Sequence, residues 1–337
     1  MEPVIQDPVS AITLPLIALS GFLVTYFLIP LLMKEFVKRG ITGVDAHKLS
    51  KPVIPEMGGV GIVIGILVSS LLALLLFHEY GSSILAFLLV ILLTAAVGIY
   101  DDLKNLHPVV KPLLTAVACL PLLLLNVYPS VLDLPFIRRA RLTLVYPLML
   151  PFAVAVPANA VNNLGVLNGA MSGTCLIAIL ALLVASFIMS RPIATLLCLI
   201  MLGSLLAFHI FNRFPSKIFE GDVGSLAVGA GIGAIAVIGR MEVIGIVALL
   251  PHITHSFSLL TGLRKASRHE AWPRPTFLRK DGKLAANEDP MAPITLVRVI
   301  LAKEPMDERS IVRSMYALSF FSLLLSVVTA FLMVESL

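Results

Sequence analysis

The sequence predicts an all-α polytopic membrane protein with about ten transmembrane helices, and its composition, its uncharged runs and its charge distribution support this fold class. Hydrophobic residues make up 58% of the 337-residue chain and charged residues only 13%, and the mean hydropathy is +0.99. A soluble domain would carry about a quarter charged residues. We therefore expect one membrane domain over residues 1–337, with most side chains facing lipid or other helices.

Uncharged runs of roughly 17–25 residues have the length that a helix needs to cross a bilayer. The stretch 142–190 is uncharged and too long for one span, and we divide it at the polar, Gly-rich segment Asn159–Gly173. The expected spans are 11–33, 57–77, 81–100, 112–132, 142–161, 171–190, 192–212, 223–239, 243–263 and 314–334.

Lysine and arginine divide unevenly between the two sets of loops that ten spans create. The first set holds 20 of the 25 basic residues and comprises loops 34–56, 101–111, 162–170, 213–222 and 264–313. The positive-inside rule places this set in the cytoplasm and both termini outside. The basic balance is thus a topology signal, and no nucleic-acid partner is expected.

The longest expected cytoplasmic loop, residues 264–313, is predicted to be partly folded. Asp281-Gly282 lies between two extended-looking runs. Such a dipeptide favours the tight turn of a β-hairpin. A small hairpin is therefore expected within this loop.

Polar residues gather densely on the expected cytoplasmic side and nowhere comparably on the other. They are Glu56, Asp101, Asp102, Asn105, Lys111, Asn159, Asn162, the segment Phe219–Ser225, and the loop from Arg268 and His269 to Arg274. We infer one site that is built from several loops.

The adjacent carboxylates Asp101 and Asp102 follow the third span and need a cation. A negative charge at a helix C-terminus opposes the helix dipole, and two neighbouring carboxylates repel each other. Lys104 or Lys111 could supply the positive charge. A divalent cation could also do so if further oxygen atoms converge there.

Candidate oxygen ligands for such an ion are the carboxylate of Asp222 and the amides of Asn159 or Asn162. Oxygen ligands without a His–Cys set suit Mg²⁺, with Mn²⁺ as an alternative. The two asparagines, three residues apart, could equally form interhelical hydrogen bonds. Asp222 alone would fit a helix N-cap.

The basic loop that contains Arg268, His269 and Arg274 has two readings as well. Arginine can clamp phosphates through paired hydrogen bonds. The same charges could simply lie near lipid headgroups, as the positive-inside rule requires.

Six short motifs resemble the polyprenyl-phosphate N-acetylhexosamine-1-phosphate transferase family, in its eukaryotic and archaeal branch. The resemblance runs from about residue 30 to 334. It is specific because the motifs follow the order and spacing of the family and lie on one expected side of the membrane. They are KPVIPEMGG, GIYDDLKNLHPVVK, PANAVNNLGVLNG, IFEGDVGSL, RHEAWPR and DGKL.

The resemblance implies ten spanning helices, an inner-face active site and a groove for a lipid chain. It assigns the acidic catalytic pair to Asp101 and Asp102, with Asn105 as a polar neighbour and Lys111 as a phosphate-contacting lysine. It assigns Mg²⁺ binding to Asn162 and Asp222.

The resemblance also implies a nucleotide site. Asn168 and Phe219 match residues that hydrogen-bond to and stack on uracil, and Arg268 and His269 match a loop that holds pyrophosphate and sugar. The expected substrate-binding set is completed by Glu56, Asn159 and Arg274.

Two departures from the family patterns concern the donor. Gly165 and Asn168 stand where the bacterial branch has acidic residues, which favours the eukaryotic and archaeal branch. Glu270 stands where the eukaryotic pattern has a second arginine, and Arg274 lies one residue later than in that pattern. The sugar is therefore the least defined part of the resemblance.

The expected reaction transfers N-acetylglucosamine 1-phosphate from a UDP-sugar to a polyprenyl or dolichyl phosphate, and UMP leaves. Another N-acetylhexosamine or a muramyl-type donor is the alternative. The expected partners are these two substrates and the membrane, and a homodimer is compatible with them. The expected location is the plasma membrane of an archaeal-like prokaryote, with the site facing the cytoplasm.

A membrane transporter with an acidic ion site is the rival from another class. A transporter should show an internal repeat and ionisable residues near mid-bilayer. The sequence has no clear repeat, and its acidic residues lie at the expected inner membrane edge.

Overall fold

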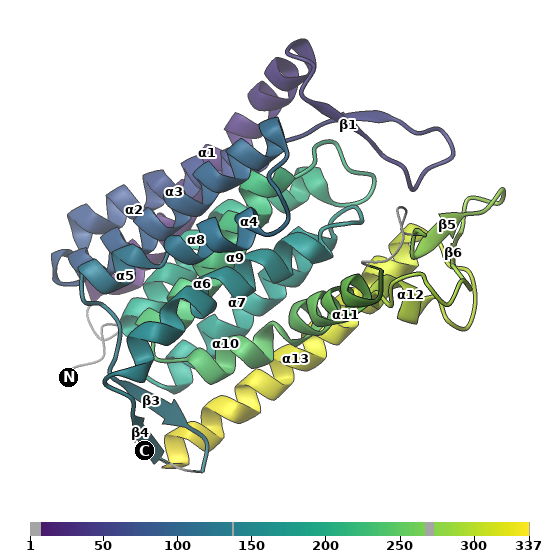
Figure 1. The fold of residues 1–337 in the computed structure, drawn as a ribbon. Coiled ribbons are helices and arrows are strands. Elements are labelled where there is room, and N and C mark those ends of the chain that lie inside the picture. The colour runs from purple at the N-terminus through teal and green to yellow at the C-terminus, as the bar shows by residue number, and fades with distance from the viewer. Residues whose placement is uncertain (1–7, 137, 267–272, 337) are drawn as a thin grey trace.

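The described residues of the protein form a bundle of long helices with three two-stranded hairpins at its ends (Figure 1). The structure is a computed structural model that describes residues 8–136, 138–266 and 273–336. The elements are α1 Pro8–Lys38, β1 Thr42–Val44, β2 Val53–Pro55, α2 Gly59–Leu76, η2 His78–Tyr80, α3 Gly81–Lys104, α4 Val110–Val117, α5 Leu120–Leu124, β3 Val131–Leu134, β4 Arg138–Arg141, α6 Val145–Leu164, α7 Ala170–Ile188, α8 Pro192–Asn212, α9 Gly221–Ile238, α10 Glu242–Ala248, α11 Leu250–Ala266, β5 Thr276–Leu278, β6 Leu284–Ala286, α12 Leu296–Ile300 and α13 Glu308–Ser336.

Within the described ranges, eight helices are long and apolar enough to cross a membrane. They are α1, α2, α3, α6, α7, α8, α9 and α13. The bent pair of α10 and α11 gives a ninth if it counts as one span. A multi-pass membrane protein is therefore confirmed, whereas ten spanning helices are not.

The expected fourth span, residues 112–132, was wrong as one continuous helix. It consists of the short helices α4 and α5, and Val131 already begins strand β3. Pro121 explains the break, because it has no N–H to donate to the carbonyl of Val117, which is the last residue of α4. Asn126, with φ +51°, then turns the chain away from a helical path.

The expected ninth span, residues 243–263, is helical but bent by 69° between α10 and α11. Pro251, the second residue of α11, cannot donate to the carbonyl of Val247 in α10. A missing bond of this kind is a common cause of sharp helix kinks.

The hairpins mark the two ends of the bundle (Figure 1). The β3–β4 hairpin lies at the end where α1 begins and α13 ends, and a 2.7 Å ion pair joins its Asp133 to Arg191 in the turn before α8. The β1–β2 and β5–β6 hairpins lie at the opposite end, which we call the site end. The β5–β6 hairpin confirms the hairpin prediction, with Gly282 at φ +81° in its turn.

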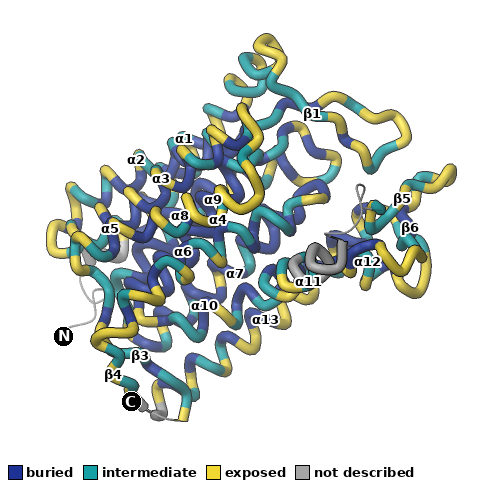
Figure 2. The backbone as a smooth tube through the Cα atoms, in the orientation of Figure 1, coloured by how far each residue is buried: buried dark blue, intermediate teal, exposed yellow. Residues whose placement is uncertain are grey.

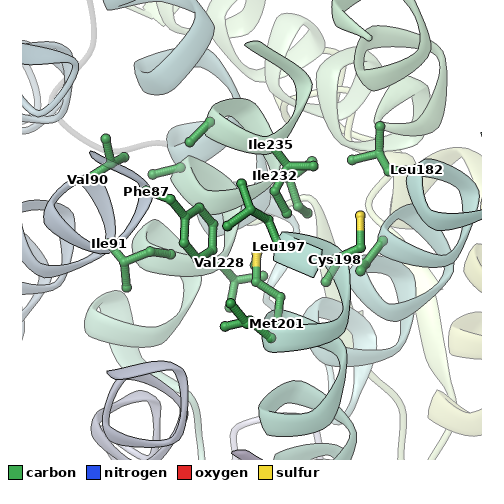
Figure 3. Packing of buried hydrophobic residues seen from close by; sticks show 14 of the residues in the cluster. Phe87, Val90, Ile91, Leu182, Leu197, Cys198, Met201, Val228, Ile232 and Ile235 are labelled. Atoms are coloured by element: carbon green, nitrogen blue, oxygen red, sulfur yellow. The ribbon is translucent and has the colours of Figure 1, made fainter. Parts of the chain in front are cut away.

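Helix α9 is the most deeply buried of the candidate spans. Figure 2 shows buried residues along the middle of the bundle and exposed ones on outer helices such as α13. Figure 3 shows side chains of α3, α8 and α9 packed together in this core, including Phe87, Met201 and Ile232. Because α9 lies at the centre, its first residues reach the middle of the site end.

A smaller apolar cluster fixes the last loop over the site end. Leu284 of β6 and Leu301, just after α12, pack with Leu164 at the end of α6 and with Met315 of α13. This contact holds residues 276–307 against the ends of the spanning helices.

Candidate active site

A cavity of about 300 Å³ opens at the site end, where α3, α6 and α9 meet the β1–β2 hairpin. Its lining brings together sequence segments that lie far apart. They are Val44–His47, Glu56, Asp102, Asn162, Gly165–Asn168, Phe219–Asp222 and Ser225. Six of the expected site residues therefore line one cavity. They are Glu56, Asp102, Asn162, Asn168, Phe219 and Asp222.

The ammonium of Lys111 lies at the centre of a cluster of oxygen atoms. Its Nζ is 2.7 Å from Asp101 Oδ2, 2.6 Å from Asp222 Oδ2 and 3.1 Å from Asn162 Oδ1. These four residues come from α3, α4, α6 and α9. A single positive charge thus already compensates two carboxylates from different helices.

Asp101 is organised by its surroundings on both of its carboxylate oxygens. Oδ1 accepts the backbone N–H of Leu106 at 2.6 Å, while Oδ2 faces Lys111. Asn105 ends α3 in the left-handed conformation with φ 52°, and its N–H donates to the carbonyl of Asp101. This turn sends the chain back so that Lys111 can reach the carboxylate.

Asp102 faces the other way and caps α9. Its two carboxylate oxygens accept the backbone N–H groups of Asp222 at 2.8 Å and Val223 at 3.1 Å. The first N–H groups of a helix have no partner within the helix, and a carboxylate there is favourable. Asp102 therefore fixes the position of Asp222 through its backbone.

The oxygen atoms around Lys111 fit a divalent cation in their chemistry. Carboxylate and amide oxygens are the ligands that Mg²⁺ accepts, and here they converge on one point charge. Asn162 is also tied to Asp222 and Ser225, since its Nδ2 donates to them at 2.5 Å and 2.8 Å. Within the described residues, no group of three or more His, Cys, Asp or Glu side chains could hold an ion. An ion here would need Asn162 and substrate oxygens.

Phe219 and Asn168 line the same cavity as Asp102 of α3. The backbone of Phe219 is fixed because its N–H donates to Pro55 at 2.9 Å and its carbonyl accepts from Gly58 at 2.8 Å. Its half-buried ring lines the cavity. Asn168 Oδ1 accepts from Lys48 Nζ at 2.5 Å and from the N–H of Ser216 at 2.8 Å, while Nδ2 donates to Asp45 at 3.2 Å.

Sequence reasoning missed the polar group that surrounds Asn168. Asp45, His47 and Lys48 belong to the loop between β1 and β2, and Asp45 pairs with Lys48. The signal was present as the polar run Asp45-Ala-His-Lys48 on the expected cytoplasmic side, but nothing in it tied the run to Asn168. Glu220 belonged to the expected polar segment Phe219–Ser225 without a role of its own, and its Oε2 accepts from Asn212 at 2.9 Å.

Burial shifts the proton affinities of three groups at this cavity. Burial, with the negative charges of Asp102 and Asp222, raises the pKa of Glu220 to about 7. Burial and the charge of Asp222 raise the pKa of Glu56 as well. Burial lowers the pKa of His47; the charge of Asp45 opposes this shift, and the charges of Lys48 and Arg274 reinforce it.

The remaining expected substrate-binding residues do not line this cavity or lie outside the described residues. Asn159 donates to Thr115 at 2.9 Å and to the carbonyl of Ala155, so it joins α6 to α4. Arg274 precedes β5, and its carbonyl accepts from Asn287. Arg268 and His269 lie outside the described residues.

The chain is similar in sequence to known transferases. The model of the family described as glycosyl transferase family 4 matches residues 84–240. A protein of Saccharolobus solfataricus is 34% identical over 246 residues, which cover 72% of this chain and 76% of the relative. Its provisional name is UDP-N-acetylglucosamine–dolichyl-phosphate N-acetylglucosaminephosphotransferase. The chain belongs to glycosyl transferase family 4.

Two further relatives of this chain have different names. A phospho-N-acetylmuramoyl-pentapeptide-transferase of Streptococcus uberis is 35% identical over 252 residues, which cover 68% of the chain and 75% of the relative. A Methanocaldococcus jannaschii protein, provisionally named a glycosyltransferase, is 29% identical over 301 residues, which cover 89% of this chain and 91% of the relative. The expectation of a membrane-bound transferase is thus confirmed, and the transporter reading is set aside.

Proposed function

We propose that this family 4 chain transfers N-acetylglucosamine 1-phosphate from its UDP donor to a polyprenyl phosphate of the dolichyl type. The observation that carries the proposal is one cavity in which Asn162 and Asp222, the hydrogen-bond and ion-pair partners of Lys111, share the lining with Phe219 and Asn168. The cluster suits the phosphates of a sugar nucleotide, and the aromatic ring with its neighbouring amide suits a nucleobase. The name of the Saccharolobus relative supports the same pair of substrates.

In this reaction an oxygen of the lipid phosphate attacks the phosphorus that bears the sugar. The bond between this phosphorus and the oxygen that bridges the two phosphates breaks, and UMP leaves with that oxygen. A phosphate monoester has a second pKa of ~6, so the acceptor is already anionic at neutral pH. A strong general base is therefore not obligatory, and the contacts of Asp101 with Leu106 and Lys111 support an organising role for this residue.

The two substrates are both anionic and must approach to about 3 Å before attack. Lys111 would reduce their repulsion once a metal ion shares the charge of Asp101 and Asp222, because its ammonium then remains available to the phosphates. Asp222 and Asn162 would hold Mg²⁺, with Asp101 beside them. When bound, the ion would neutralise charge that develops on the leaving phosphate. Asp102 would act indirectly, by fixing the N-terminus of α9.

An apolar cavity of about 330 Å³ supports a lipid acceptor. It lies between α6, α9, α10 and α11, and its lining includes Phe152, Val156, Ile232 and Ile246. We propose that part of the isoprenoid chain packs there, which leaves its phosphate at the site end.

The direct test is transfer of radiolabelled sugar phosphate by purified protein to polyprenyl phosphate, across a panel of UDP-sugars. The proposal expects a labelled lipid and UMP with UDP-N-acetylglucosamine. Transfer only from a muramyl-pentapeptide donor would favour the activity that the Streptococcus relative's name states. No labelled lipid with any donor would refute the proposal.

We also propose that the site end faces the cytoplasm of an archaeal-like cell, because 20 of the 25 lysine and arginine residues belong to loops expected there. Single cysteines at Lys280 and Arg141, exposed at opposite ends, test this orientation. An impermeant reagent should label position 141 in intact cells and position 280 only after lysis. The reverse pattern would overturn the orientation.

A further inference from the structure

A third cavity, of about 520 Å³, lies at the site end between α8, the loop 213–217 and the first turns of α13. Arg213, Lys217, Arg309 and Arg313 line it, and Phe214 and Tyr316 add aromatic rings. No carboxylate lines it within the described residues. We refer to it as the basic cavity.

The two acidic residues that precede Arg309 in the sequence accept hydrogen bonds from other residues. Asp307 accepts from the backbone N–H and hydroxyl of Ser310 at 3.0 Å and 2.7 Å. Glu308 accepts the backbone N–H of Asn168 at 2.8 Å. In the described part of the chain, the four basic residues of the cavity form no ion pair. Like charges around one cavity repel each other, and a bound anion would remove that repulsion.

The chemistry of the lining favours a phosphate ester. A guanidinium donates two parallel hydrogen bonds to phosphate oxygens, and three of the four cations are arginines. The guanidinium of Arg309 lies 4.6 Å from the ring centre of Phe214, which limits its freedom before any ligand binds. The cavity thus offers oriented donors as well as positive charge.

The position of the basic cavity favours a lipid over a soluble phosphate. The candidate span of α8 ends at Asn212 and that of α13 begins at Glu308, so the cavity lies at the membrane edge. Leu206 and Phe320 lie one helical turn deeper than the lining residues Ile210 and Tyr316 and on the same helix faces. Both are exposed, at 46% and 53%. An apolar surface therefore continues from the cavity into the membrane.

We propose that the basic cavity binds the phosphate of an anionic membrane lipid, whose chains lie against α8 and α13. The cavity also touches the nucleotide side of the active site, because Asn168 lines both cavities. Ser216 of the same loop donates to Asn168, and Lys48 lies 4.8 Å from the ring centre of Phe214. A bound lipid would thus stabilise the loop that holds Asn168.

Thermal unfolding of the full-length protein in neutral detergent tests this site. Short-chain phosphatidylglycerol is compared with phosphatidylcholine of the same chains, with glycerol phosphate and with inorganic phosphate. The variant is Arg213→Gln/Arg309→Gln/Arg313→Gln. The matched control, Arg279→Gln/Lys280→Gln/Lys283→Gln, removes three exposed charges from the β5–β6 hairpin at the same end. If the triple variant does not fold, Arg313→Glu replaces it.

Phosphatidylglycerol should raise the unfolding temperature of the wild type and of the control. Both proteins should reach half of the maximal rise at the same lipid concentration. The cavity variant should need at least about tenfold more lipid for half of the maximal rise, since it lacks the charge-assisted hydrogen bonds from the three guanidinium groups to the phosphate. Equal weakening in the control would mean diffuse surface charge and would overturn the proposal. Equal stabilisation by phosphatidylcholine, by glycerol phosphate or by inorganic phosphate would overturn the anionic-lipid assignment.

Discussion

The carboxylate of Asp102 accepts the backbone N–H of Asp222 at 2.8 Å, so an acidic residue of α3 fixes an acidic residue of α9. The adjacent residues Asp101 and Asp102 thus have different surroundings. Asp101 faces Lys111, whereas Asp102 serves as the N-terminal cap of another helix. The two carboxylates of the pair should therefore respond differently to substitution.

Asp102→Ala should lower both the unfolding temperature and kcat, because it removes the cap of α9 and releases Asp222. Loss of a capping side chain costs about 0.5–2 kcal/mol. Asp102→Asn keeps one acceptor and should recover part of the stability. Thermal unfolding and steady-state kinetics of both variants measure this. Full stability of Asp102→Ala with no activity would instead mean that Asp102 acts on the substrate.

Gly98→Ala should destabilise the protein and reduce its activity, although alanine favours helices. A Cβ at Gly98 would lie 2.4 Å from the Cα of Val223, and a backbone atom cannot rotate away. Overpacking of this kind typically costs 1–3 kcal/mol, and here it would displace the start of α9 from α3. Unfolding temperature and kcat are the measurements.

Gly81→Ala is the matched control in the same helix. Nothing lies within 4 Å of a Cβ at Gly81, so this variant should be as stable as the wild type or slightly more so. Equal effects at the two positions would contradict the close contact between α3 and α9.

Glu220→Gln should stabilise the protein increasingly as the pH rises from 5 to 8. The pKa of Glu220 is raised to about 7 in the folded state, against ~4.3 in an unfolded chain. Between these values the unfolded state binds fewer protons, so wild-type stability falls as the pH rises. Glutamine removes the charge and keeps the bond from Asn212. Unfolding temperatures in EDTA across this pH range test the prediction.

The control for Glu220→Gln is Glu288→Gln, which changes an exposed carboxylate. Its effect on the unfolding temperature should be small at every pH. A difference between Glu220→Gln and the wild type that stays constant from pH 5 to 8 would rule out the buried charge as the cause.

The parts of the fold that depend on local pattern were predictable from the sequence. The run 192–212 coincides with α8 because an uncharged run between a proline and a polar turn leaves little choice of helix ends. The prediction of one helix over residues 112–132 was wrong because hydropathy alone does not account for the hydrogen bond that is lost at Pro121. The β1–β2 hairpin has only three residues in each strand, too few for a periodic signal.

The candidate site was predictable as a set of residues on one side, but its pairings were not. Asp101, Lys111, Asn162 and Asp222 were expected at one end of the bundle, and the structure brings them together. The capping role of Asp102 and the bonds of Lys48 to Asn168 depend on how helices far apart in sequence pack. No spacing within one segment encodes such contacts.

Removal of divalent metal should abolish transfer, and Mg²⁺ or Mn²⁺ should restore it. The reason is the convergence of oxygen atoms from Asp101, Asn162 and Asp222. Asp222→Ala should lose activity and still insert into the membrane. These points are checked by the radiolabel assay in EDTA and by membrane fractionation. Undiminished transfer in excess EDTA would refute the metal site.

Lys111→Met gives a second test of the metal that does not depend on activity. Without metal, the variant should unfold at a lower temperature than the wild type, because two carboxylates lose their only shared cation among the described residues. Added Mg²⁺ should therefore raise the unfolding temperature of Lys111→Met more than that of the wild type. An equal Mg²⁺ effect on both proteins would show that the ion does not bind at this cluster.

Phe219→Ala should raise the KM for the UDP-sugar and leave the KM for the lipid phosphate nearly unchanged. The backbone of Phe219 is held by Pro55 and Gly58, so the variant should keep the loop and lose only the ring. A stacking face is worth ~1–3 kcal/mol per base, which corresponds to a rise in KM of roughly five- to a hundredfold. The lipid substrate arrives from the membrane and does not need this ring.

The alternative is that Phe219 is an interfacial residue that packs near lipid headgroups. That alternative predicts lower stability or expression with an unaltered KM for the donor. The kinetics of folded protein, with each substrate varied separately, distinguish the two, and Phe219→Tyr is a control that keeps the aromatic face. Because Phe219 precedes the metal-binding candidate Asp222 by three residues, a rise in the lipid KM alone would move the nucleobase to another part of the cavity.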